Sequence, residues 1–166
     1  GVRFAHEVHP SEIAYDYWSS QRALAALDHR KAFRFNWDPS HMMWQGVDPV
    51  GFIVDFAERI YHVDCKDTRL RPMNGRAGVL GSHLPWGDPR RGWDFVSTGH
   101  GDVPWEDAFR ALRAIGYMGP ISIEWEDAGM DRLHGAAQAV TFVRSLLWKL
   151  PSARFDAVFM ENSTTR

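Results

Sequence analysis

Acidic residues and histidines recur at four places along the chain, each at the end of a short apolar run. The four sets are Glu7 and His9; Asp38 and His41; His62, Asp64 and Lys66; and Glu124 and Glu126. Burying several carboxylates together is costly unless a cation neutralises them. Carboxylate oxygens and imidazole nitrogens are ligands of hard divalent ions. These residue types therefore predict a metal centre, provided that the fold brings the four places together.

Each of these residues alone has an ordinary interpretation. Asp38 precedes Pro39, so its carboxylate could be a helix cap or a turn former. A single histidine is usually a satisfied interior or surface residue. Four such sets in succession are hard to explain by packing, so we favour the metal centre. Residues two apart on a strand share a face, and the pattern therefore does not choose one member of each set.

Apolar patterning predicts an alternation of strands and helices. Strands are expected at 2–8, 33–38, 60–66 and 121–125. Helices are expected at 13–27 after an N-cap at Ser11, from Asp48-Pro49, at 104–115 and at 133–147. This alternation favours an α/β fold with a parallel sheet. A doubly wound sheet is the rival, but the turn after the first strand, residues 7–11, has no glycine.

Four strand–helix units match half of a (β/α)₈ TIM barrel, which typically needs about 250 residues. In such a barrel the carboxyl ends of all strands meet on one face, which would bring the four polar sets together. We expect residues 1–150 to form this half barrel, with a long loop at 67–103 and a C-terminal tail at 151–166.

The composition is that of an ordinary globular domain, with 45% apolar residues, 24% charged residues and a net charge of −2. This charge gives no reason to expect nucleic acid or a membrane as a partner. The single cysteine, Cys65, suits the cytoplasm. The chain opens within a strand pattern, so we expect an oligomer or a larger protein in which other polypeptide supplies the rest of the barrel.

Five segments together resemble the sugar phosphate isomerase/epimerase family, a part of the xylose-isomerase-like TIM barrel superfamily. They are Glu7-Val8-His9-Pro10, Asn36-Trp37-Asp38-Pro39-Ser40-His41, Tyr61-His62-Val63-Asp64-Cys65-Lys66-Asp67, Thr98-Gly99-His100-Gly101-Asp102 and Ile121-Ser122-Ile123-Glu124. The resemblance implies that the chain is the C-terminal half, with the last four units of the barrel. It assigns the metal ligands to Glu7, Asp38, His62 and Glu124. It suggests that His41 contacts substrate hydroxyls and that His9 and Lys66 line the same pocket. Asp64 and His100 are further candidate substrate contacts.

The implied cofactor is one divalent ion, Mn²⁺ before Mg²⁺, Co²⁺ or Zn²⁺, because three carboxylates and one imidazole form a hard, oxygen-rich site. Such an ion could acidify the C–H bond next to a sugar carbonyl, and Glu7 or Glu124 could then act as general base. The expected activity is sugar, sugar phosphate or cyclitol isomerisation or epimerisation. The ketose 3-epimerases of the family carry an arginine shortly after the histidine ligand; here Arg69 is displaced, which argues against that activity.

Other functions remain open. A lyase, a dehydratase or a C-glycoside-cleaving subunit would use the same residues, and the chain could also be a non-catalytic subunit that needs a partner. A metallonuclease like endonuclease IV would need more histidine ligands and a basic groove. A non-haem iron oxygenase is suggested only by His62-Val63-Asp64.

The segment 67–103 is longer than a simple connection and is typical of a lid or a binding loop. Trp86 or Trp93 could stack on a sugar, and Arg90 or Arg91 could hold a phosphate or carboxylate. Alternatively, the tryptophans pack locally and the arginines pair with Asp88 or Asp94.

Overall fold

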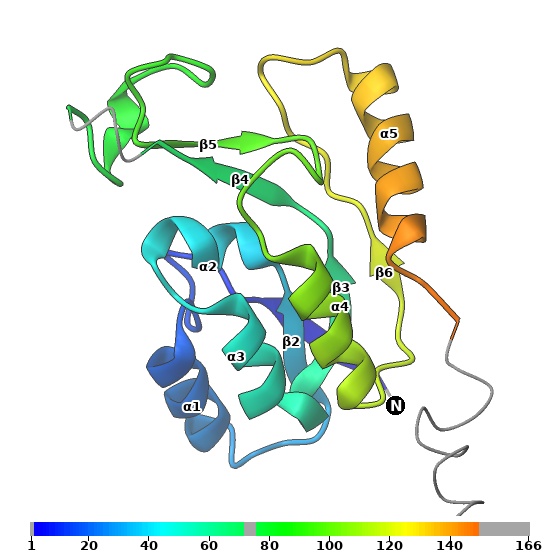
Figure 1. The fold of residues 1–166 in the computed structure, drawn as a ribbon. Coiled ribbons are helices and arrows are strands. Elements are labelled where there is room, and N and C mark those ends of the chain that lie inside the picture. The colour runs from blue at the N-terminus through cyan, green and yellow to red at the C-terminus, as the bar shows by residue number, and fades with distance from the viewer. Residues whose placement is uncertain (1, 72–75, 150–166) are drawn as a thin grey trace, which may run out of the picture.

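The computed structural model describes residues 2–71 and 76–149. At its centre lies a parallel sheet of four strands (Figure 1). In spatial order they are β1 (Phe4–Glu7), β2 (Phe33–Trp37), β3 (Ile60–Asp64) and β6 (Ile121–Ser122). Each strand thus neighbours the next parallel strand along the chain. A doubly wound sheet contains a reversal of strand order, which this part of the chain lacks. The order is that of a barrel segment, as predicted.

Helices connect the strands. They are α1 (Tyr17–Ala26), α2 (Pro39–Gln45), α3 (Pro49–Asp55), α4 (Trp105–Ala114) and α5 (Arg132–Ser145), with 3₁₀ turns η1 (Ala57–Arg59) and η3 (Gly81–His83). None of the helices in the described ranges is long and apolar enough to cross a membrane.

Strand β2 shows how the sequence separates the core from the site. Its alternate residues Phe33, Phe35 and Trp37 are buried, and Phe35 packs edge-on against Phe52 of α3 with ring centres 5.6 Å apart. Burying each such side chain contributes about 1.5–3 kcal/mol. Asn36, between them, points to the opposite face of the sheet, as strand alternation requires. The polar side chains of the strands therefore gather on the face away from the helices.

Helix α1 begins later than predicted. Ser11 has φ of 77° and is not its N-cap. Asp16 is the cap instead: its Oδ1 accepts from the Ser19 backbone N at 2.7 Å, and Ser19 Oγ accepts from the Asp16 backbone N at 2.9 Å. This reciprocal pair satisfies two donors at the helix start. Ile13, expected on the buried side of the helix, lies outside it and is exposed.

Helix α2 was not predicted. Of the two local interpretations given for Asp38, helix cap or turn former, the structure shows the helix cap, and Pro39 occupies the first turn of the helix, where its missing N–H costs nothing. Asp38 caps this helix, and Gly46, in the left-handed conformation with φ of 80°, ends it. The result is that His41 lies on a helix that starts directly at the end of β2.

The long segment 67–103 contains an antiparallel hairpin that was also not predicted. Strand β4 (Asp67–Leu70) pairs with β5 (Trp93–Val96), in a register that places Asp67 opposite Val96. The hairpin rises above the carboxyl end of the parallel sheet (Figure 1). The last parallel strand is shorter than predicted and ends before Glu124. The tail predicted at 151–166 lies outside the described residues.

Asp67 fixes the loop that leads into α4. Its Oδ2 accepts hydrogen bonds from the backbone N of Gly99 at 2.8 Å and of Gly101 at 3.0 Å, and from Trp105 Nε1 at 2.8 Å. Its Oδ1 accepts from Thr68 N at 2.9 Å. A Cβ on Gly101 would collide with this carboxylate, so only glycine allows the loop to approach.

Candidate metal centre

Three of the predicted residues converge at the carboxyl end of the sheet. One ligand atom each of Glu7, Asp38 and His41 lies within 4.8 Å of the others. His41 Nε2 is 3.4 Å from Glu7 Oε1 and 3.3 Å from Asp38 Oδ2. Glu7 ends β1, Asp38 follows β2, and the register that pairs Glu7 with Asn36 sets the two carboxylates side by side. We call these three residues the Glu7 cluster.

The two oxygens of Asp38 have different environments. Oδ1 caps α2, accepting from the Ser40 backbone N at 2.8 Å and from Ser40 Oγ at 2.6 Å. Oδ2 is fully buried and makes no hydrogen bond within the described residues, although His41 Nε2 lies 3.3 Å from it. Burial raises the pKa of Asp38 well above its usual range, against the lowering effect of the Ser40 hydrogen bonds. An unsatisfied buried carboxylate oxygen is what a bound cation would satisfy, so this site fits a divalent ion.

The other two members of the Glu7 cluster have the protonation states that a ligand needs. The contact with His41 lowers the pKa of Glu7, against an opposing effect of burial, and favours its carboxylate form. Burial lowers the pKa of His41, although the contact with Glu7 acts in the opposite direction. A neutral imidazole has a lone pair for a metal, and a deprotonated carboxylate has the charge.

His62, a predicted ligand, belongs to a different group of polar side chains. Its Nε2 lies 2.7 Å from Ser122 Oγ and 3.2 Å from Asp64 Oδ1. Asp64 also accepts hydrogen bonds from Asn36 Nδ2 and from the Ser122 hydroxyl. This network links β2, β3 and β6 on the same face of the sheet as the Glu7 cluster. The geometry does not bring His62 into that cluster, and its ligand role stays a prediction.

Glu124, the fourth predicted ligand, is already paired with a cation. Lys66 Nζ lies 2.6 Å from Glu124 Oε1 and 2.7 Å from Glu126 Oε1, and 4.3 Å from the ring centre of Phe95. The Lys66 side chain is 4% exposed, whereas the two glutamates are 39% and 47% exposed. Burial disfavours the ammonium form, but the hydrogen bonds to Glu124 and Glu126 raise the pKa of Lys66 overall.

A pocket of about 810 Å³ opens beside the Glu7 cluster. Its lining includes His9 and His41, whose ring centres are 4.1 Å apart, and the aromatic side chains Trp44, Trp86, Trp93 and Phe95. Trp44 and Trp93 stack in parallel at 4.7 Å, and the half-exposed Trp86 stacks on Phe95 at 5.2 Å. This size is within the range of small-molecule sites.

Residues 1–146 match the sequence model of the xylose isomerase-like TIM barrel family. The chain belongs to this family.

Two curated proteins are similar to the chain in sequence. The chain is 31% identical over 115 residues, 68% of its length, to the uncharacterised protein YfiH of Bacillus subtilis (strain 168). It is 31% identical over 126 residues, 76% of its length, to the rhizopine catabolism protein MocC of Rhizobium meliloti. In each case the matched region is 37% of the relative, so this xylose isomerase-like chain spans little more than a third of either protein.

Solved structures share the fold. A xylose isomerase domain protein from Planctomyces limnophilus matches with a TM-score of 0.62 and 22% identity, covering 87% of this chain and 44% of that one. The probable 3-DHS dehydratase AsbF of Bacillus anthracis gives 0.58 and 22%, covering 84% and 49%. A D-allulose 3-epimerase from Methylomonas sp. gives 0.61 and 18%, covering 89% and 49%. The predicted half of a TIM barrel is thus confirmed.

In this xylose isomerase-like chain, the arginines of the long loop pair with acidic residues of the same segment. Arg90 Nη2 lies 2.6 Å from Asp88 Oδ2 at the surface, and Arg91 Nε lies 2.8 Å from Asp94 Oδ1 in the interior. Arg90 does not line the pocket beside the Glu7 cluster. The alternative interpretation of these arginines, local pairing, is what the structure shows. Arg91 lines the pocket while it is paired with Asp94, and so do Trp86 and Trp93, the two predicted stacking residues.

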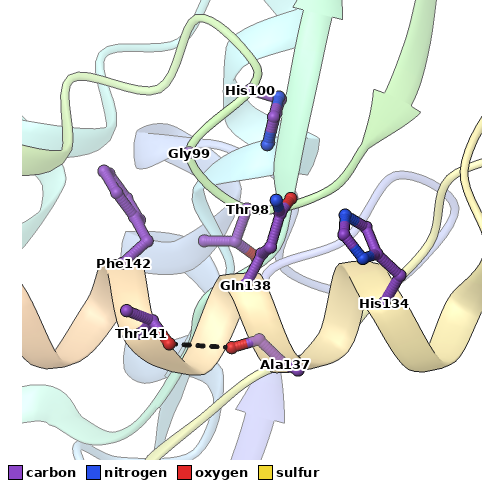
Figure 2. A pocket seen from close by; sticks show the side chains of 8 residues that line it. All are labelled: Thr98, Gly99, His100, His134, Ala137, Gln138, Thr141 and Phe142. Carbon is purple, nitrogen blue, oxygen red and sulfur yellow. Dashed lines mark hydrogen bonds between the residues drawn. The ribbon is translucent and has the colours of Figure 1, made fainter.

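His100 lies apart from the Glu7 cluster. Figure 2 shows it beside a second pocket, of about 540 Å³, between the loop at Thr98–His100 and α5. The lining there comes from Thr98, Gly99, His100, His134, Ala137, Gln138, Thr141 and Phe142, with no member of the Glu7 cluster. The structure therefore does not bring His100 to the pocket where we expected it.

Phe95 is one of the pocket residues that the sequence analysis did not predict. It contacts both Lys66 and the ring of His41, the latter at 5.3 Å between ring centres. The available signal was the alternation Trp93-Asp94-Phe95-Val96, which is typical of a strand and would have placed the aromatic rings of Trp93 and Phe95 on one face.

Proposed function

We propose that this chain carries the metal centre of a divalent-metal-dependent isomerase or epimerase acting on a sugar, a sugar phosphate or a cyclitol. The observation that carries the proposal is the buried, unsatisfied Oδ2 of Asp38, directed at Glu7 and His41. A bound cation would stabilise a buried carboxylate oxygen in that state.

The Glu7 cluster would hold the ion, and the family resemblance adds Glu124 and His62 to the ligand set. Carboxylate oxygens with imidazole favour Mn²⁺, then Mg²⁺, Co²⁺ or Zn²⁺, over thiolate-preferring metals. Cys65 is not a competing ligand, because it is fully buried in the core. A bound ion would supply Lewis-acid polarisation of a substrate carbonyl.

Glu7 and Glu124 are the candidate proton carriers. Glu7 ends the first strand of the sheet and Glu124 follows the last one, so the two would approach a substrate from different directions. One removes the proton from the carbon next to the carbonyl, and the other returns a proton to the opposite face, which inverts that carbon. Return of the proton to the neighbouring carbon exchanges aldose and ketose instead.

The aromatic pocket supports a small polyhydroxylated substrate. Tryptophan and phenylalanine faces pack against the C–H face of a sugar ring, while His9 and His41 supply polar groups at the metal side. The D-allulose 3-epimerase among the structural neighbours and the rhizopine catabolism protein among the relatives fit this substrate class.

Elimination is the second candidate activity, supported by the structural likeness to a probable dehydratase. The same carboxylate removes the proton, and a hydroxyl on the β-carbon leaves. A multi-zinc nuclease has less support, because the described residues contain a single group of three or more metal-ligand side chains.

We further propose that other polypeptide completes the barrel. Strands β1 and β6 form the two ends of the sheet order. Open strand edges promote aggregation, and a barrel removes them by closure. The remaining half would come from the same protein or from another subunit.

Two substitutions test the proton-transfer proposal. Glu7→Gln and Glu124→Gln keep a carbonyl ligand but remove the base, so each should retain bound Mn²⁺ and lose about 10²–10⁴-fold in turnover. Glu12→Gln, at an exposed position, is the matched control. In D₂O the wild-type protein should place deuterium at the carbon next to the carbonyl, and release of water would indicate elimination.

Near wild-type exchange in a Glu7→Gln/Glu124→Gln double variant would exclude both carboxylates as the base. His9, His41 or Lys66 would then be the remaining candidates. A comparison of His41→Gln with His62→Gln by Mn²⁺ titration decides which imidazole binds the ion, and we expect His41→Gln to have the larger effect.

A further inference from the structure

Lys66 has an unusual position for a lysine. Its side chain is 4% exposed, and its ammonium is clamped between Glu124 and Glu126 at 2.6 and 2.7 Å. A buried lysine is tolerated only when its charge is compensated, and here two carboxylates and the ring of Phe95 compensate it. One of the two carboxylates, Glu124, is a predicted ligand of the proposed metal ion.

Lys66 also acts on the Glu7 cluster. The ring of Phe95 joins the two groups, because its centre lies 4.3 Å from Lys66 Nζ and 5.3 Å from the ring centre of His41. Burial raises the pKa of Asp38 overall, and the charge of Lys66 acts in the opposite direction. The ammonium, Glu124 and the Glu7 cluster therefore share one electrostatic environment. Without a metal ion, Lys66 is the cation that offsets the carboxylates at this end of the sheet.

We propose that Lys66 is the resident counter-cation of the metal centre. Lys66 holds Glu124 until a divalent ion binds, and it then releases Glu124 to the ion and stays paired with Glu126. This inference rests on the proposed metal-dependent function. Lys66 is accordingly a positioning residue that sets how tightly the centre binds metal.

Glu126 makes this exchange feasible. If Glu124 were the only partner, its departure would leave a buried ammonium without an anion, which is strongly unfavourable. With Glu126 at 2.7 Å, Lys66 stays paired after Glu124 has moved. Both glutamates are partly exposed, so their side chains have room to rotate, whereas the lysine does not.

The test is a calorimetric Mn²⁺ titration of the full chain and its variants, with Mn²⁺ alone as the probe. Lys66→Met removes the competitor for Glu124 and should tighten binding by about tenfold or more. Glu126→Gln removes the partner that Lys66 would keep, so Lys66 should hold Glu124 more strongly and binding should weaken by about tenfold. The double variant should stay within about threefold of Lys66→Met, because Glu126 matters only while Lys66 is present.

Matched controls are Lys31→Met and Glu12→Gln, which make the same charge changes at exposed positions and should leave the affinity within about twofold. Additive effects, with the double variant returning to the wild-type affinity, would mean that the two residues act only through net charge, and would overturn the exchange. An unchanged affinity of Glu126→Gln would overturn it as well, even if Lys66→Met does not fold. A wild-type chain that binds no Mn²⁺ refutes the metal centre itself, and the exchange with it.

Discussion

Substitution of Asp38 by asparagine separates two effects of the Asp38 carboxylate. One is its cost to the stability of the metal-free protein, and the other is its contribution to the proposed binding of Mn²⁺. Asparagine keeps an oxygen that can accept from Ser40 and cap α2, but it removes the buried negative charge. The metal-free protein should therefore become more stable. Mn²⁺ should bind more weakly, and excess Mn²⁺ should restore part of the binding.

The size of the effect follows from the environment of Oδ2. An unsatisfied buried polar group costs about 1–3 kcal/mol, and a charged one costs more. We expect the free energy of unfolding to rise by about 1–3 kcal/mol, and Tm by about 2–12 °C at about 2–4 °C per kcal/mol for a chain of this size. The free energy of unfolding of the wild-type protein should rise by about 2.7 kcal/mol when Mn²⁺ is present at about 100 times its Kd.

The gain in stability of the Asp38→Asn variant over the wild type should increase as the pH rises. Because burial raises the pKa of Asp38 in the folded state, the folded protein holds this proton more tightly than the unfolded chain does. Wild-type stability should fall as the pH rises from the ordinary aspartate pKa of about 4 through the raised value. The advantage of the Asp38→Asn variant should be small in acid and largest near neutrality.

Asp48 provides the matched control. Like Asp38, it precedes a proline and caps a seven-residue helix, accepting from Val50 N at 2.9 Å, but it is exposed. Asp48→Asn should change the stability by less than about 0.5 kcal/mol and leave the Mn²⁺ response intact. Thermal melts with chelator and with Mn²⁺ measure both effects. An Asp38→Asn variant that melts no higher than wild type in chelator, or that keeps the full Mn²⁺ shift, would refute the reasoning.

Three further predictions concern other parts of the chain. Asp67→Asn should lower the free energy of unfolding by about 3 kcal/mol in urea titrations. Both carboxylate oxygens of Asp67 accept from N–H donors, so the NH₂ group of asparagine would face a donor in either orientation. Asp102→Asn, at an exposed carboxylate of the same loop, should lower it by less than about 1 kcal/mol. Burial raises the pKa of Tyr117 to about 12, so one tyrosine should ionise late in an ultraviolet titration, and Tyr117→Phe should remove that step. Stability should fall between pH 10 and 12, as the unfolded chain ionises first. Trp86→Ala should raise KM about tenfold with little change in kcat, if the pocket wall binds substrate uniformly; an unchanged KM would remove Trp86 from the substrate site.

Local patterns were sufficient for the parallel strands and the identity of their polar ends. The alternation of Phe33, Phe35 and Trp37 predicted both a strand and its buried face. The start of the first helix was harder to predict, because several residue types can cap a helix. Ser11 is of a suitable type, but Asp16 has Ser19 at the spacing of a reciprocal pair. The β4–β5 hairpin joins segments more than twenty residues apart, and no local turn signal announces such a pairing.

The ligand set was harder to predict than the fold because polar residues two apart compete for one face. His62, Asp64 and Lys66 follow one another along β3 and its extension, and the sequence cannot say which of them meets which partner. A register irregularity between Phe35 and Asn36 shifts β2 against β3 at this point. Asn36 then pairs with His62, and Asp64 reaches Ser122. Such a shift depends on three-dimensional packing and leaves no mark in the alternation pattern.

The anchoring of the hairpin has a consequence for how this protein can change over evolutionary time. Asp67 ties the start of β4 to the loop before α4, and β4 pairs with β5 along its length. Both ends of the intervening segment, which carries Trp86 into the pocket, are thus fixed to the scaffold by the paired strands, and Trp93 lines the pocket from β5 itself. Insertions, deletions or exchanges there would reshape the substrate pocket while Glu7, Asp38 and His41 stay in place. The paired strands thus allow the segment between them to vary while the Glu7 cluster, the proposed metal site, stays unchanged.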